Sequence, residues 1–160
     1  MTPLILACLT LSLSAVIVGG VLLGFSDFIM RALLQSPPAS AIGVMQKINV
    51  TVMRSIFLKL FLALAPASLA LSAFVWQGAP SEANIWIYSG TALYVTGSFL
   101  VTIFGNVPMN NRLAGLAADT QDAAIYWQIY GRRWTQLNSV RTLACIASAV
   151  CFLGAALVLL

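Results

Sequence analysis

The sequence predicts an all-α fold, in which four transmembrane helices form a bundle and one further amphipathic helix lies at the membrane interface. The mean hydropathy is +0.96, and 61% of the residues are hydrophobic while only 8% are charged. Soluble domains have a lower hydrophobic fraction and a higher charged fraction than this sequence. Four apolar runs approach or exceed the roughly 20 residues that cross a bilayer. The polar breaks between them are too short to form a soluble domain, so we expect a single integral membrane domain over residues 1–160.

The four predicted spans follow from these apolar runs and from the residues that bound them. We place them at residues 4–25, 56–76, 84–104 and 143–160. The first run has neither a basic start nor a small-residue cleavage site, so we expect it to be a membrane helix and not a secretory signal. Trp86 and Tyr88 stand at the start of the third run, as aromatic residues do at membrane interfaces.

The amphipathic helix is predicted at residues 39–53, a segment too short and too polar to span the membrane. Pro37 and Pro38 break the chain before it, and Pro38 fits the first turn of a new helix. Gln46 and Asn49 fall on the apolar face of this helix. An amide is costly to bury unless it is hydrogen-bonded, so these two side chains are candidates for a polar site.

A polar stretch, residues 105–112, ends the third apolar run abruptly. Pro108 lacks an N–H donor and disfavours the helical conformation in the residue before it, so we predict that the helix stops near Gly105. The stretch is rich in side chains that can donate hydrogen bonds: Asn106, Asn110, Asn111 and Arg112. Several such groups at the foot of a membrane helix predict either a tightly hydrogen-bonded turn or a polar pocket.

The last helix carries a stripe of aromatic and polar side chains. We expect this helix to begin at Gln121, after a cap at Asp119 and Thr120, and to continue into the fourth span. The stripe consists of Trp127, Tyr130, Trp134, Asn138 and Arg141. Their spacing of 3, 4, 4 and 3 places them within about 80° of one helical face. Aromatic residues at the interface and a snorkelling arginine would explain the stripe without a site, most simply for Trp127 and Tyr130.

Basic residues predict the orientation in the membrane. They occur in the first connection and in the third: Arg31, Lys47, Arg54 and Lys59, then Arg112, Arg132, Arg133 and Arg141. The connection between the second and third spans has none. Positively charged connections stay in the cytoplasm, so we expect both termini outside it, in a bacterial inner membrane. The polar candidates should then gather at the cytoplasmic edge.

Composition excludes several kinds of chemistry from the expected function. Histidine is absent, which removes the usual ligand of haem, zinc, copper and di-iron centres. Cys8, Cys145 and Cys151 lie inside apolar runs without a CxxC motif, so we interpret them as buried hydrophobic residues. No basic cluster of the kind that binds nucleic acid occurs. We expect no metal, no cofactor and no nucleic-acid partner; the expected partners are the lipid bilayer and a lipophilic small molecule.

Two stretches carry a resemblance to a known family. They are residues 105–114 (GNVPMNNRLA) and 127–150 (WQIYGRRWTQLNSVRTLACIASAV). Together with residues 25–30, 36–38 and 45–49, they resemble the anthrone oxygenase-like integral membrane family (domain of unknown function 1772). The resemblance covers nearly the whole chain. It implies this membrane fold and, from fungal members that oxidise anthrones to anthraquinones, O2-dependent oxidation of a flat lipophilic phenol.

The candidate residues can be assigned to that chemistry. An anthrone enolate can pass an electron directly to O2, so no cofactor is required. We assign catalysis to Asp27, Asn138 and Arg141, and substrate binding to Gln46, Asn49, Asn106, Asn110, Asn111, Arg112, Tyr130 and Trp134. In this scheme Asp27 is the base, the aromatic rings stack on the substrate, and Asn138 and Arg141 stabilise its oxyanion.

Two alternatives stay open at this point. The first is a non-catalytic membrane scaffold, in which the polar turn at residues 105–112 only ties helix ends together. Asp27 and Arg31 are spaced to form an ion pair within one helix, and that pair would leave no base for the oxidation. A small transporter component is the other alternative. Coupled transport usually needs an ionisable residue near the middle of the bilayer, and the predicted spans contain none there.

Overall fold

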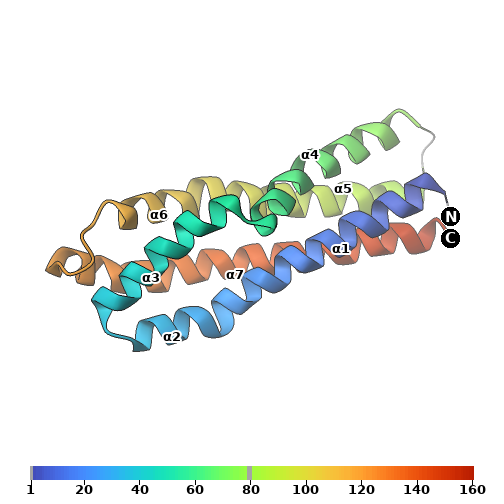
Figure 1. Ribbon diagram of the computed structural model, residues 1–160. Helices are drawn as coiled ribbons and strands as arrows, with labels where there is room; N and C mark the ends of the chain where they lie inside the picture. Colours follow the sequence, from blue (N-terminus) through green and yellow to red (C-terminus); the bar gives the residue numbers. More distant parts are fainter. Residues whose placement is uncertain (1, 79–80) are drawn as a thin grey trace.

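In the computed structural model, which describes residues 2–78 and 81–160, long helices run side by side and a shorter one packs across them (Figure 1). The chain is 90% helical, and no strand occurs within those two ranges. The predicted all-α fold class is confirmed. Four helical stretches are long and apolar enough to cross a membrane: Pro3–Gln35, Ile56–Trp76, Glu82–Ala114 and Gln121–Val158. The protein is therefore a multi-pass membrane protein whose apolar helices contact lipid.

Two of the four stretches combine α-helix with short π-helical segments, in which the turns are wider. The first stretch consists of α1 (Pro3–Gly24), the π-helical η1 (Phe25–Ile29) and α2 (Met30–Gln35). The third consists of α5 (Glu82–Tyr94), the π-helical η3 (Val95–Leu100) and η4 (Thr102–Asn106), and α6 (Val107–Ala114). The remaining elements are α3 (Pro38–Thr51), the 3-10 turn η2 (Val52–Arg54), α4 (Ile56–Trp76) and α7 (Gln121–Val158).

Local signals in the sequence explain where several helices begin. The side chains of Thr2, Ser55 and Thr120 each accept a hydrogen bond from the backbone N–H three residues further on. Pro38 occupies the first turn of α3, as predicted. The second span coincides with α4, and the amphipathic helix is α3.

The predicted helix end near Gly105 was wrong. The helix continues through η4 into α6 and ends only at Ala114. Pro108 falls in the first turn of α6, directly after the π-helical turn. We attribute the continuity of the helix to that wider turn. A proline lacks the N–H donor of a helical hydrogen bond and its ring crowds the preceding turn, and the π-helical turn changes the hydrogen-bond pattern at this point.

Three helical stretches are longer than a membrane crossing. They contain 33, 33 and 38 residues, or about 50 to 57 Å at 1.5 Å per residue, against about 30 Å of hydrocarbon. They extend together at the end that carries α2, α3 and α6, and the two termini lie at the opposite end (Figure 1). The basic connections therefore meet at one end of the molecule. Which side of the membrane this end faces remains a prediction.

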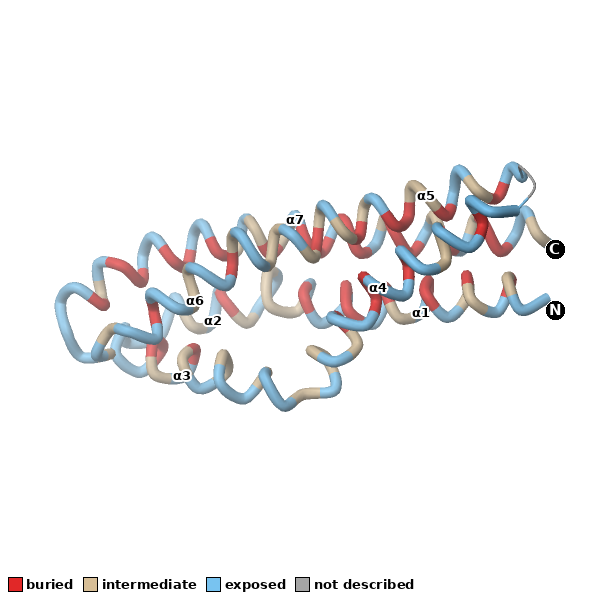
Figure 2. The backbone as a smooth tube through the Cα atoms, turned by 90° about the horizontal axis from the view of Figure 1, so that it is seen from above, coloured by how far each residue is buried: buried red, intermediate tan, exposed pale blue. Residues whose placement is uncertain are grey.

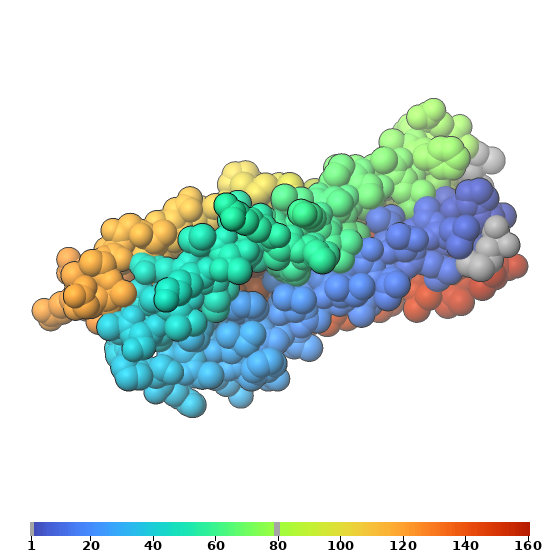
Figure 3. All heavy atoms as spheres, viewed as in Figure 1, coloured from blue at the N-terminus to red at the C-terminus, as the bar shows by residue number. Residues whose placement is uncertain are grey.

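The buried side chains form two clusters along the bundle, and α7 contributes to both. Figure 2 shows buried positions in red along α7. The first cluster, the membrane core, includes Leu11, Val18, Leu22, Phe61, Tyr94, Cys145 and Phe152. The second, the aromatic core, includes Met30, Met45, Leu113, Trp127, Tyr130 and Trp134. On the face seen in Figure 3, α3 and α4 lie beside α1 and α2. Gly97 allows a close approach to α7, since a Cβ there would lie 2.6 Å from the Cβ of Ala144.

Candidate functional site

A layer of buried polar side chains separates the membrane core from the aromatic core. Along α7, Asn138 and Arg141 lie between Trp134, which belongs to the aromatic core, and Cys145, which belongs to the membrane core. Asn106 is buried in the same region and donates from Nδ2 to the backbone oxygen of Trp134 at 3.3 Å. We call this set, with Ser26, the polar layer.

The π-helical segments supply polar groups that face this part of α7. Ser26 comes from η1 and Asn106 from η4, while Ser98 of η3 accepts a hydrogen bond from the thiol of Cys145 at 3.2 Å. π-Helical turns are rare and occur frequently at functional sites. Three of them pack against α7, and this marks the polar layer as a candidate functional site.

Asn138 ties α7 to the first helical stretch. Its side-chain Nδ2 donates to the backbone oxygen of Leu22 at 2.7 Å and to Oγ of Ser26 at 2.8 Å. Ser139 also donates to Oγ of Ser26, at 3.1 Å. An amide nitrogen has two hydrogens to donate, so both donors of Asn138 are used within the protein. Asn138 therefore positions its neighbours and has no free donor for a substrate oxygen.

Arg141 is a buried cation, and no carboxylate of the described residues pairs with it. Its side chain is 6% exposed. Nη1 donates a long hydrogen bond of 3.4 Å to Oδ1 of Asn138, and the guanidinium carbon lies 5.5 Å from the centre of the Phe61 ring. Nε is buried without a hydrogen-bond partner. A guanidinium offers five N–H donors and is costly to bury unpaired. An ionisable group so placed in a membrane protein is a functional-site candidate.

The aromatic stripe of α7 forms a packed stack. Tyr130 lies between Trp127, at 5.5 Å between ring centres, and Trp134, at 5.9 Å. Oδ1 of Asn110 accepts hydrogen bonds from the Tyr130 hydroxyl at 2.8 Å and from Nε1 of Trp134 at 2.9 Å. The predicted common face is present. These rings stack on each other, and Trp134, the member of the stack nearest to Asn138 along α7, also contacts Phe25 of η1 at 5.8 Å between ring centres.

The amphipathic helix α3 contributes amides to the aromatic core. Nε2 of Gln46 donates to the backbone oxygens of Leu113 and Leu116, both at 2.9 Å. These bonds satisfy carbonyl groups at the end of α6, where a helix leaves acceptors without partners. Asn49 is half-buried and lies within reach of the Tyr130 hydroxyl, although among the described residues its Nδ2 makes no hydrogen bond of good geometry.

Three predicted site residues lie on the exposed surface, outside both the polar layer and the buried aromatic core. Asn111 and Arg112 are exposed, and the guanidinium of Arg112 lies 4.2 Å from the centre of the Tyr126 ring. Asp27 is also exposed and makes none of the hydrogen bonds of the layer. Its neighbour Ser26 reaches Asn138 instead. The prediction that Asp27 acts as a base therefore gains no support from hydrogen bonding.

Ser26 is a site residue that the sequence assignment missed. It lies in η1, where a π-helical turn holds one more residue than an α-helical turn would. This shifts the helical register by one residue, and periodicity cannot tell which of two neighbours faces inward. A serine beside an aspartate in that position was the only available signal.

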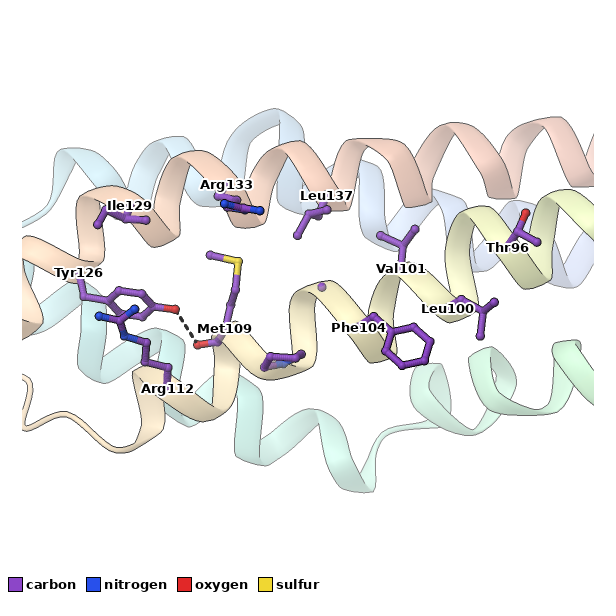
Figure 4. Close-up of a pocket in the computed structure, with 12 residues that line it drawn as sticks. Thr96, Leu100, Val101, Phe104, Met109, Arg112, Tyr126, Ile129, Arg133 and Leu137 are labelled. Atoms are coloured by element: carbon purple, nitrogen blue, oxygen red, sulfur yellow. Dashed lines mark hydrogen bonds between the residues drawn. The ribbon is translucent and has the colours of Figure 1, made fainter.

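A groove runs along the outside of the bundle between the third helical stretch and α7 (Figure 4). Its volume is about 680 Å³. The lining residues are Thr96, Leu100, Val101, Phe104, Gly105, Pro108, Met109, Arg112, Tyr126, Ile129, Arg133 and Leu137. Trp134, Asn138 and Arg141 are not among them. At Gly105 an added Cβ would lie 2.9 Å from Cδ1 of Leu137, so the helices approach closely there.

Comparison with known proteins adds one match. A family model described as anthrone oxygenase matches residues 50–151, which include α4 to α6 and most of α7. The matched range contains Asn106, Asn138 and Arg141 of the polar layer, but not Ser26. No curated protein and no solved structure matches the chain.

Proposed function

The chain belongs to the anthrone oxygenase family, and from that premise we propose that it oxidises a flat, lipophilic phenol of the anthrone class with O2. The observation that carries this proposal is the buried guanidinium of Arg141, whose Nε has no partner. Oxidation of an anthrone passes through an enolate, and a fixed cation in a site that excludes water stabilises such an anion strongly.

The main requirement of this reaction is a site that stabilises the enolate anion. Loss of one C–H proton between the two rings gives the enolate, which transfers one electron to O2. The resulting substrate radical and superoxide combine to a hydroperoxide, which loses water to leave a carbonyl. Overall, one CH2 group and one O2 become one C=O group and one H2O. Arg141 would hold the enolate oxygen, and Asn138 would position Arg141 through its Oδ1.

The aromatic side chains beside the polar layer provide contacts for a flat substrate. Phe61 lies against the guanidinium of Arg141, and Phe25 contacts Trp134. Ring faces and edges of this kind bind flat aromatic molecules. With Asp27 exposed, we propose that the proton leaves to water at the membrane edge. The substitution Asp27→Asn should then change the rate of anthrone oxidation by less than about twofold, because an exposed group away from the reacting atoms contributes little to stabilising the enolate.

The test compares arginine variants in lipid nanodiscs. Anthrone consumption and O2 uptake are measured above the spontaneous rate. We expect Arg141→Gln to lower kcat/KM by about 100-fold, the effect of removing one oxyanion donor, and Arg141→Lys to restore part of it. Arg132→Gln is the matched control, because Arg132 is an exposed arginine on the same helix. No consumption by the unmutated protein, or equal rates for both glutamine variants, would contradict the proposal.

A non-catalytic scaffold is the second candidate, and two observations favour it. The aromatic stack is packed as a core, and Gln46 serves the end of α6. In a scaffold, the polar layer would only join helices. Arg141→Gln would then alter folding without any separate activity to lose, so the same variants distinguish the two candidates.

A further inference from the structure

The groove between the third helical stretch and α7 has a charged end and an apolar end (Figure 4). Arg112 and Arg133 line the charged end, and neither an aspartate nor a glutamate lines any part of it. The apolar end is formed by Leu100, Val101 and Phe104. Such a division suits a molecule with an anionic head and a hydrocarbon tail.

Contacts with neighbouring residues hold the side chain of Arg112 in place at the charged end. Arg112 packs over the ring of Tyr126 at 4.2 Å, and the Tyr126 hydroxyl donates to the backbone oxygen of Met109 at 3.3 Å. Among the described residues, the guanidiniums of Arg112 and Arg133 donate no hydrogen bond to the protein. Both arginines are exposed, so their N–H donors are free to bind the oxygens of a phosphate.

The apolar end of the groove exposes hydrophobic side chains on the outside of the bundle. Phe104 is 76% exposed. Leu137 of α7 forms the opposite wall, close to Gly105. A hydrocarbon chain lying in this part of the groove would cover apolar surface on both helices.

The length of the groove fits one membrane leaflet. Thr96 and Arg112 line it and stand 16 residues apart on one helical stretch. At about 1.5 Å per residue, that separation is roughly 24 Å. Half of the hydrocarbon core, about 15 Å, together with the adjoining headgroup region of about 5 to 7 Å, gives a similar length.

We propose that this groove binds one anionic phospholipid from the leaflet at the end of α2, α3 and α6. The phosphate and headgroup lie at Arg112 and Arg133, and one acyl chain follows Phe104, Val101 and Leu100 towards the middle of the bilayer. This binding is independent of the proposed oxidation, because none of its contacts involves Arg141.

The test is lipid retention by the purified protein, measured by native mass spectrometry after exchange into phosphatidylglycerol or phosphatidylcholine. We expect the unmutated protein to retain one phosphatidylglycerol in preference to phosphatidylcholine. The double variant Arg112→Gln/Arg133→Gln should retain about tenfold less, given the attraction of each surface arginine for anionic lipid. The double variant Arg31→Gln/Arg54→Gln is the matched control, since it removes the same charge from exposed positions outside the groove.

A second variant tests the apolar end without changing the charge. Val101→Trp should fill the groove and lower phosphatidylglycerol retention while leaving both arginines in place. Thermal unfolding of each variant establishes that the bundle is intact. Equal retention of the two lipids, or a loss in the Arg31→Gln/Arg54→Gln control as large as in the groove variant, would overturn the proposal. Undiminished retention by Val101→Trp would overturn the placement of the acyl chain.

Discussion

Arg141 holds a buried charge with little to offset the cost of burying it. Within residues 2–78 and 81–160, its side chain makes one long hydrogen bond, to Asn138, and one contact with the Phe61 ring, and no carboxylate pairs with it. Replacing a buried ion pair by apolar side chains of similar size is often neutral or stabilising, by about 1 to 4 kcal/mol, and a buried cation without a carboxylate partner has still less attraction to lose. A residue kept at a cost to stability is typical of a functional site.

We therefore predict that Arg141→Met raises the free energy of unfolding by about 1 to 3 kcal/mol while it abolishes anthrone oxidation. Reversible unfolding in mixed micelles and the nanodisc assay measure the two effects on the same preparation. Loss of stability in Arg141→Met would instead assign Arg141 a structural role.

Asn110 has the opposite character, because its side chain satisfies two buried donors. We predict that Asn110→Ala lowers the free energy of unfolding by about 2 to 4 kcal/mol, since the Tyr130 hydroxyl and the Trp134 indole N–H both lose their acceptor. The control is Asn111→Ala, an exposed neighbour, whose effect should stay within about 0.5 kcal/mol. Similar losses in both variants would show that the hydrogen bonds of Asn110 contribute little.

The sequence showed which polar residues occur near the predicted site, but it did not show which of them face inward. The stripe on α7 was predictable because it lies on an uninterrupted helix, where spacing determines the face. The exposure of Asn111 and the inward position of Ser26 were not. Asn111 lies beyond η4 and Ser26 within η1, and a π-helical turn shifts the register by an amount that the side chains alone do not reveal.

Among the elements, the π-helical segments explain where prediction and structure differ. The sequence predicted α4 to the residue and the position of α3, because apolar runs and caps bound them. It failed at Pro108, where a helix-breaking residue sits inside a continuous helical stretch. In a π-helical turn the backbone N–H bonds to the carbonyl five residues earlier and not four. The amino-acid composition does not indicate this change, so the sequence did not predict the wider turn.

This account predicts a small effect for Pro108→Ala. A proline in a helix interior costs about 3 kcal/mol, but Pro108 directly follows the wider π-helical turn η4, which we take to accommodate both the missing N–H and the proline ring. Pro108→Ala should change the free energy of unfolding by less than about 1 kcal/mol. Pro66→Ala, in the interior of α4, provides the comparison. A gain near 3 kcal/mol for Pro108→Ala would mean that η4 does not accommodate the proline.

At the scale of the whole molecule, the polar layer lies where the bundle changes character. On one side, α1, α4, α5 and the second half of α7 enclose the membrane core; on the other, α2, α3, α6 and the first half of α7 enclose the aromatic core. The apolar part of α7 begins two residues after Arg141. The proposed oxidation would therefore take place at the predicted membrane edge, where a lipophilic substrate and dissolved O2 would both be available.

The same architecture makes the orientation testable. The end that carries α2, α3 and α6 holds the basic connections, so it should face the cytoplasm, with the termini and the connection after α4 outside. In a background without Cys8, Cys145 and Cys151, we predict that a membrane-impermeant maleimide labels Gln77→Cys in intact cells. Asp119→Cys should react only after the membrane is opened. Both positions are exposed, so reagent access differs only by the side of the membrane. The reverse pattern would place Arg112 and Arg133 in the outer leaflet, where anionic lipid would have to be supplied from that side.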